Sequence, residues 1–248
     1  MRALWSQWKA DLLRTVRDRR FFAFTLVMPV GFYLIFIHIQ HGTLQIAGTF
    51  WSAYFMVSMA TFGVVGASVN TLGVRLATER KSGWVRWLRT TPLSSVGYAL
   101  SKIFTQMVLS LLIVVVVFLV ARLDQHVSLS AAKWIEIVLW IWIGSVPFAA
   151  LGVLIGMAGN AAQVLGTMVY LALSLLGGLW TPIQVLPKTM QEIARVMPTY
   201  RYAHPAWGLL ANRGIQWSDV LILAAYTIGF VALAAFIQRR MEAKPEAG

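Results

Sequence analysis

The chain has 248 residues, of which 58% are hydrophobic, and its mean hydropathy is +0.70. This composition is too apolar for a water-soluble domain and indicates several membrane spans. The absence of cysteine excludes disulfides and cysteine-ligated metal sites. A net charge of +12 would point to nucleic acid in a soluble protein, but here the cations lie between long apolar stretches.

Residues 1–20 are predicted to form a basic amphipathic helix. Leu4, Trp5, Trp8, Leu12 and Val16 share an arc of about 120° on a helical wheel, and the basic residues lie mostly on the remaining arc. Such a helix lies at the membrane interface, as a lipid anchor or as a docking surface for a cytoplasmic partner. The leader is too long and too acidic for a signal peptide, so the first apolar stretch is interpreted as an uncleaved anchor.

Five stretches contain no charged residue: Phe21–Ile37, Thr49–Val74, Ile103–Ala121, Ile137–Pro187 and Val220–Gln238. A span needs about 20 apolar residues, so the 51-residue stretch Ile137–Pro187 is read as two spans joined at the turn Ala158–Ala161. The prediction is an all-α protein with six transmembrane helices: Phe21–Ile39, Thr49–Leu72, Lys102–Val120, Lys133–Met157, Ala161–Leu179 and Asp219–Ile237. Pro29 and Pro147 are expected to kink spans one and four.

The charges between the spans predict the orientation. With both termini cytoplasmic, 15 of the 21 lysines and arginines fall on the cytoplasmic side, as the positive-inside rule requires. The spans themselves contain no carboxylate relay of the kind that ion-coupled pumps use. If the protein moves a substrate uphill, the energy is therefore expected to come from outside the membrane.

The loop from Arg75 to Gly97 contains a short helical pattern, Gly83–Arg89, that ends before Pro92. Trp84, Trp87 and Leu88 share one face of this pattern, and either the bilayer surface or another protein is expected to bury that face. After span five, prolines divide residues 177–216 into short pieces, including a short helix at Met190–Val196, that dip into the membrane or lie at its surface. Trp180, Tyr200, Tyr202, Trp207 and Trp217 are expected to form the outer aromatic belt.

Few other polar residues carry a chemical hypothesis. Ser58, Thr61, Thr167 and Ser174 are candidates for lining a transport pathway, although hydroxyls in membrane helices more often serve packing or bond to their own helix. His38 and His41 lack a third ligand nearby, so no metal site is predicted. The sequence contains no catalytic constellation and no phosphate-binding loop, so the chain is not expected to be an enzyme.

Three segments together resemble the permease subunits of bacterial ABC exporters, the six-span ABC-2 type (type V exporter-like) of drug, lipid and polysaccharide efflux systems. They are ERKSGWVRWLRTTPLS at Glu79–Ser94, GGLWTPIQVLP at Gly177–Pro187, and Pro198–Tyr200. The likeness covers essentially the whole chain.

The resemblance implies a domain plan: residues 1–20 as a cytoplasmic interface helix, 21–240 as the six-helix transmembrane domain and 241–248 as a cytoplasmic tail. It implies that the loop holds a coupling helix that sits in a groove of a separate ATPase, where ATP and magnesium bind. The coupling residues would be Glu79, Arg80, Lys81, Gly83, Trp84, Trp87, Leu88 and Pro92, with Trp5, Trp8 and Leu12 on the interface helix. Charge pairing by Glu79, Arg80 and Lys81 is expected to fix the register of that contact.

The resemblance also implies a re-entrant cap on the outer side, made by Gly178, Trp180, Pro182, Pro187 and Pro198. Two permeases, identical or paralogous, and two ATPases would form the transporter in the bacterial plasma membrane, with spans two and five lining the pathway. The function implied is ATP-driven efflux of drugs, lipids or other amphiphiles. The alternative is a membrane scaffold or channel-like protein whose basic segments bind anionic lipid.

Overall fold

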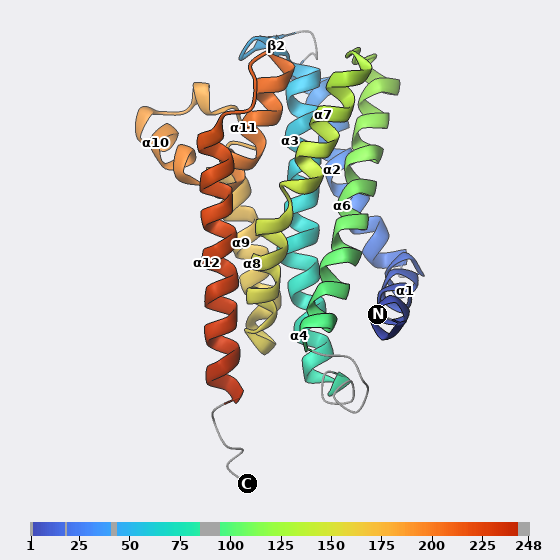
Figure 1. The fold of residues 1–248 in the computed structure, drawn as a ribbon. Coiled ribbons are helices and arrows are strands. Elements are labelled where there is room, and N and C mark those ends of the chain that lie inside the picture. The colour runs from blue at the N-terminus through green and yellow to red at the C-terminus, as the bar shows by residue number, and fades with distance from the viewer. Residues whose placement is uncertain (1, 18, 41–43, 85–94, 243–248) are drawn as a thin grey trace.

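The structure is a computed structural model, and it describes residues 2–17, 19–40, 44–84 and 95–242. These residues form a bundle of helices with one two-stranded hairpin at the end away from the chain termini (Figure 1). The helices are α1 Arg2–Arg17, α2 Arg19–Gln40, α3 Trp51–Gly66, η1 Ala67–Thr71, α4 Leu72–Lys81, α6 Ser95–Gln125, α7 Ala131–Ile143, α8 Val146–Gly156, η2 Gly159–Ala161, α9 Ala162–Leu176, η3 Ile183–Val185, α10 Lys188–Val196, α11 Pro198–Leu210 and α12 Trp217–Glu242, and the strands are β1 Gln45–Ile46 and β2 Thr49–Phe50.

The prediction of an all-α polytopic membrane protein is confirmed. Within the described residues, five continuous helical stretches are long and apolar enough to cross a membrane: Trp51–Lys81, Leu100–Gln125, Ala131–Gly156, Gly159–Leu176 and Trp217–Met241. They correspond to predicted spans two to six. Predicted span one corresponds to α2, whose apolar part Thr25–Gln40 is shorter than these five.

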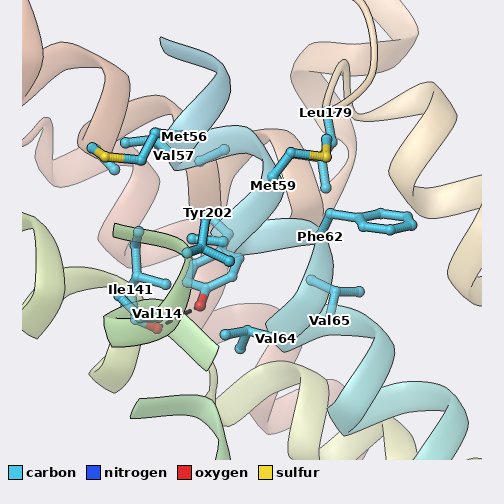
Figure 2. Packing of buried hydrophobic residues seen from close by; sticks show 14 of the residues in the cluster. Met56, Val57, Met59, Phe62, Val64, Val65, Val114, Ile141, Leu179 and Tyr202 are labelled. Atoms are coloured by element: carbon cyan, nitrogen blue, oxygen red, sulfur yellow. Dashed lines mark hydrogen bonds between the residues drawn. The ribbon is translucent and has the colours of Figure 1, made fainter. Parts of the chain in front are cut away.

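The helix Trp51–Lys81 is the axis of the bundle. Its first part, α3, is apolar on all sides, and all but one of its residues are buried. Figure 2 shows Met56, Met59 and Phe62 of α3 reaching outward into the surrounding core. By contrast, α12 keeps most of its apolar side chains exposed, as expected of a helix that faces lipid.

The axis changes its winding at η1, one turn of π-helix between α3 and α4. Here α8 crosses at very short range, because a Cβ atom on Gly152 would lie 1.9 Å from the carbonyl oxygen of Ser68. Gly156 follows four residues later and would similarly collide with Leu76. Small residues at this spacing let membrane helices approach backbone to backbone. The contact fixes predicted span four against predicted span two.

Both predicted interruptions around span four are present. The span is divided into α7 and α8 at Gly144, and Pro147 lies in the first turn of α8, so the helix is interrupted close to the predicted position. The predicted turn after the span is also confirmed, because η2 separates α8 from α9 and Gly159 has φ +58°. The helix α2 continues through Pro29.

The segment after span five differs from the prediction in one respect. The short helix is present as α10, two residues longer at its N-terminus, but a second helix, α11, follows it and lies among α3, α7, α9 and α12. Tyr202 and Trp207 of α11 are 0% and 5% exposed, and Tyr200 is also buried.

The prediction that these three aromatic residues belong to an outer belt is therefore wrong. The hydroxyl of Tyr202 donates to the carbonyl oxygen of Ile141, which is drawn in Figure 2. The indole nitrogen of Trp207 donates to Ser58 Oγ at 3.1 Å. The polar atoms of Tyr202 and Trp207 thus find hydrogen-bond partners inside the bundle, and this allows α11 to be buried. Trp217, at the start of α12, is exposed, as a belt residue should be.

Candidate functional site

Three helices that are far apart in sequence meet at the end of the bundle that carries the chain termini. Figure 1 shows α1, the end of α4 and the beginning of α6 close to one another there. The end of α4 leads into the predicted coupling loop, and α6 leads out of it. The contact between these helices is made by charged side chains in an otherwise nearly charge-free bundle.

Lys102 of α6 is the centre of this contact. Its Nζ lies 2.7 Å from Asp11 Oδ1 of α1 and 2.7 Å from Glu79 Oε1 of α4. The three side chains are at most 5% exposed. A buried cation with two carboxylates at hydrogen-bond distance holds three helices together through charge-assisted bonds.

The other carboxylate oxygens are also bonded. Glu79 Oε2 accepts from the hydroxyl of Tyr98, and Asp11 Oδ2 accepts from Gln7 Nε2 at 3.2 Å and Ser101 Oγ at 3.4 Å. Burial raises the pKa of Tyr98, and the nearby Glu79 carboxylate raises it further, so the phenol remains a proton donor. Buried charges are tolerated when their lone pairs are matched in this way.

Two arginines surround the cluster. Arg75 Nε lies 3.8 Å from Glu79 Oε1, and its Nη1 donates to Thr15 Oγ1 of α1. Arg14 Nη1 lies 3.9 Å from the same Glu79 oxygen, but 65% of the Arg14 side chain is exposed. We call Asp11, Arg14, Arg75, Glu79 and Lys102 the charge cluster. It contains three cations and two carboxylates and therefore carries an excess positive charge.

These residues were not predicted from the sequence to form one site. Lys102 was predicted only as the first residue of span three, and no role was predicted for Asp11 or Tyr98. One signal was present: Asp11–Thr15, Arg75–Glu79 and Tyr98–Lys102 are each polar pairs four residues apart, so each pair shares a helix face. Only the tertiary structure brings these three faces together.

The predicted coupling residues have different positions. Glu79 is 3% exposed, which contradicts the expectation that its carboxylate pairs with a partner at the surface. Arg80 Nη2 donates to Gln238 Oε1 of α12 at 3.2 Å, and Lys81 is exposed. Gly83 has φ +73° and ends α4, a conformation that favours glycine after a helix. Trp84 is 36% exposed, and Trp87, Leu88 and Pro92 lie outside the described residues.

The predicted interface helix is present as α1, and it packs against the bundle along one edge of the predicted apolar face. Asp11 and Thr15 are buried, whereas Trp5 is 62% exposed and Leu12 is half-buried. The rings of Trp5 and Trp8 lie 4.6 Å apart, centre to centre. The edge of the apolar face therefore docks on α6 through Asp11, and Trp5 points away from it.

Three of the four pathway candidates are fully buried within the chain. Ser58 and Ser174 donate to the carbonyl oxygens of Tyr54 and Tyr170, four residues earlier, at 3.1 and 2.7 Å. Thr61 is also 0% exposed. Ser58 and Ser174 therefore bond to their own helix, which was the alternative prediction for these hydroxyl groups. The half-buried Thr167 donates to Asn70 Oδ1 at 3.3 Å and joins α9 to η1.

The predicted cap residues surround the short helices after α9. Gly178 has φ +74°, and a Cβ atom there would lie 2.5 Å from Ile183 Cγ2. Trp180 packs against Phe32 and Phe62, with ring centres 5.8 Å away in both cases. Pro182, Pro187 and Pro198 occupy the starts of η3, α10 and α11, where a missing N–H is tolerated.

A second buried ion pair fastens this region to α12. Asp219 is 0% exposed and accepts from Arg201 Nη1 at 2.9 Å, while His204 Nδ1 lies 2.8 Å from its other oxygen. Across the described residues, no group of three histidine, aspartate or glutamate side chains is arranged to hold a metal ion.

An apolar helical bundle with several helices long enough to cross a membrane defines a polytopic membrane protein. The model of the ABC-2 type transporter family matches residues 2–205, and the chain belongs to this family. It is 35% identical over 245 residues to the putative transport permease YvfS of Bacillus subtilis (strain 168), which covers 98% of this chain and 100% of that protein. The predicted family is confirmed, and the chain is a transport permease.

Proposed function

We propose that this permease is the membrane subunit of an ATP-driven exporter and that the charge cluster transmits movement from a separate ATPase to the spans. Permeases of this family generally work with an ATPase subunit. The supporting observation is the position of Lys102, which ties both helices flanking the predicted coupling loop to α1. A displacement of the loop therefore moves α1, α4 and α6 together.

The movement has a direct route into the core. Helix α4 continues through η1 into α3, the buried axis of the bundle, and α6 packs along α3 over much of its length. Closely packed cores transmit a displacement because their side chains interdigitate. Glu79 and Lys102 then act as positioning residues inside the permease, and the partner contact is made by exposed groups such as Lys81 and Trp84.

The assembly that we propose has two permeases and two ATPases, with ATP and magnesium bound by the ATPases. Both termini would lie on the cytoplasmic side of a bacterial plasma membrane. The gathering of α1, the loop ends and the Arg239–Arg240 end of α12 at one end of the bundle supports this orientation. Because Ser58, Thr61 and Ser174 are buried inside one chain, the pathway would lie between two copies rather than within one. The mostly apolar outer faces favour an amphiphilic cargo.

The test is reconstitution in proteoliposomes with and without the ATPase. Transport that needs ATP and the second chain supports the proposal, and full transport by the permease alone overturns it. For the loop, Trp84→Ala and Trp87→Ala should weaken co-purification with the ATPase. The matched control is Trp217→Ala, an exposed tryptophan at the opposite end of the bundle. Equal recovery of the complex in all three variants would show that the loop is not the docking element.

A further inference from the structure

A groove opens beside the charge cluster, between α1, the η1–α4 region and the beginning of α9. Its volume is about 400 Å³, whereas the cavity next to Lys102 measures about 10 Å³ and has room for one water molecule at most. Arg14, Asn70, Thr71, Arg75, Thr78 and Gln163 supply its polar lining. The proposed ATPase contact uses none of these side chains.

The electrostatics of the groove are one-sided. Its two charged lining residues, among those that the structure describes, are Arg14 and Arg75. The nearest carboxylate, Glu79, is engaged by Lys102 at 2.7 Å and lies 3.8 and 3.9 Å from the two arginines. The excess positive charge of the cluster therefore falls on the groove side. A single anion in the groove would neutralise it in a partly desolvated place, where charge-assisted bonds are strong.

An exposed apolar stripe on α9 begins one residue after the groove lining. Gln163 lines the groove, and directly after Gln163 the helix α9 presents Val164, Met168, Leu171 and Leu175, which are 40–64% exposed. These four residues are spaced by three or four positions and form one stripe along the helix. A polar, basic pocket at the start of an exposed apolar stripe fits a molecule with an anionic head and an apolar tail.

The backbone at the groove supports a binding role. Asn70 and Thr71 belong to η1, and a single turn of π-helix within an α-helix frequently marks a functional position. The turn widens the helix where α9 approaches it, and Asn70 bonds to Thr167 of α9. Asn70 therefore lines the groove and also joins predicted spans two and five.

We propose that this groove binds the phosphate group of a singly charged anionic amphiphile, with Arg14 and Arg75 as its counter-charges and α9 as the track for its apolar chain. The inference rests on the proposed export function for the role of the ligand as cargo, and it names the chemical class of that cargo. Binding itself requires neither ATP nor the ATPase.

The experiment measures binding to the purified permease in neutral detergent micelles by native mass spectrometry. The probes are phosphatidylglycerol, phosphatidylcholine of the same chain length, and inorganic phosphate. Both lipids carry the phosphate, but the choline cation of phosphatidylcholine would lie close to Arg14 and Arg75 and be repelled, so phosphatidylglycerol should bind at least about tenfold more tightly. Inorganic phosphate should not displace phosphatidylglycerol, because inorganic phosphate has no apolar chain to contact α9.

Gln163→Glu places a carboxylate in the groove without changing the charge cluster, and it should weaken phosphatidylglycerol binding by about tenfold. Arg14→Gln should have a similar effect. Gln125→Glu, at the opposite end of α6, is the matched control and should bind like the original chain, and thermal melting shows whether each variant is folded.

Equal affinity for the two lipids, or full binding by a folded Gln163→Glu variant, overturns the inference. If inorganic phosphate displaces phosphatidylglycerol, the groove is a site for free anions, and the proposal of an amphiphilic ligand is wrong. If the permease shows no selective binding of phosphatidylglycerol but ATP-driven transport is intact, this inference is wrong and the proposed function stands. Selective binding together with transport that ignores ATP refutes the proposed function instead.

Discussion

Replacing Lys102 with methionine removes the cation that lies 2.7 Å from both Asp11 and Glu79. Methionine has a similar length and fills the space, so the change isolates the charge. Two carboxylates that are at most 5% exposed then lose their shared partner and face each other across the gap. The variant should be folded less stably than the original chain.

The expected magnitude follows from the burial. Removing one partner of a buried ion pair costs about 3–5 kcal/mol, because the remaining charge stays desolvated. For a chain of this size, 1 kcal/mol lowers the melting temperature by roughly 2–4 °C, so the expected fall is roughly 6–20 °C. Lys188→Met, which changes an exposed lysine on α10, should shift the melting temperature by less than about 2 °C.

A triple variant separates charge from packing. Lys102→Met combined with Asp11→Asn and Glu79→Gln leaves no buried charge at the centre, and replacement of a whole buried ion group by neutral residues is often nearly neutral for stability. Most of the lost stability should return. If the charge cluster positions the coupling loop, the triple variant should still hydrolyse ATP in the full complex but transport less substrate per ATP.

The assay is the melting temperature of the detergent-solubilised chain, followed by size-exclusion chromatography, together with the ratio of transport to ATP hydrolysis in proteoliposomes. If the single Lys102→Met variant melts within about 2 °C of the original chain, the buried carboxylates do not depend on Lys102 and the predicted role of this lysine is wrong. A triple variant with restored stability and an unchanged transport ratio would restrict the cluster to a structural role.

Three further changes test the packing of the bundle by the same melting assay. Gly152→Ala should lower the free energy of unfolding by about 1–3 kcal/mol, because its new methyl group would collide with the backbone of Ser68. The control Gly229→Ala, where a Cβ atom would have no atom within 4 Å, should be neutral or slightly stabilising. Equal behaviour of the two variants would contradict the close approach of α8 to η1. Tyr202→Phe should lower the free energy of unfolding by about 1–3 kcal/mol, because the buried carbonyl group of Ile141 loses its hydrogen bond. The control Tyr226→Phe removes an exposed hydrogen bond and should lower the free energy of unfolding by less than about 1 kcal/mol. The reverse order would be inconsistent with a buried α11. Asp219→Asn should lose about 1–3 kcal/mol by weakening both bonds to α11, and an unchanged melting temperature would count against that ion pair.

Much of the architecture was readable from hydropathy and turn residues. Five of the six predicted spans correspond to long apolar helices, and the interruptions at Pro147 and Gly159 lie where proline and glycine predicted them. These are local properties, because a continuous apolar stretch must satisfy its own backbone in the bilayer as a helix. The amphipathic pattern of residues 1–20 predicted α1 for the same reason.

The predictions that failed concern which face of a helix meets which neighbour. Tyr202 and Trp207 were assigned to the outer belt because aromatic residues near a membrane surface are usually interfacial, yet α11 lies inside the bundle. Glu79 was expected to pair with a partner because the loop that begins with it resembles the coupling loop of the family, yet it is bonded to Lys102. Burial of a polar group depends on a partner that is distant in the sequence, and local composition does not identify that partner.

Hydropathy, charge bias and motif order are properties of the linear chain, so they were enough to predict a helical membrane permease. Packing of the helices was needed to bring Asp11 and Glu79 to Lys102, although Asp11 and Lys102 are 91 positions apart in the sequence, and to place Arg14 and Arg75 along one groove. The physical reason is that a buried charge and a binding groove are both made by side chains from different helices, and their distances are set only when those helices pack.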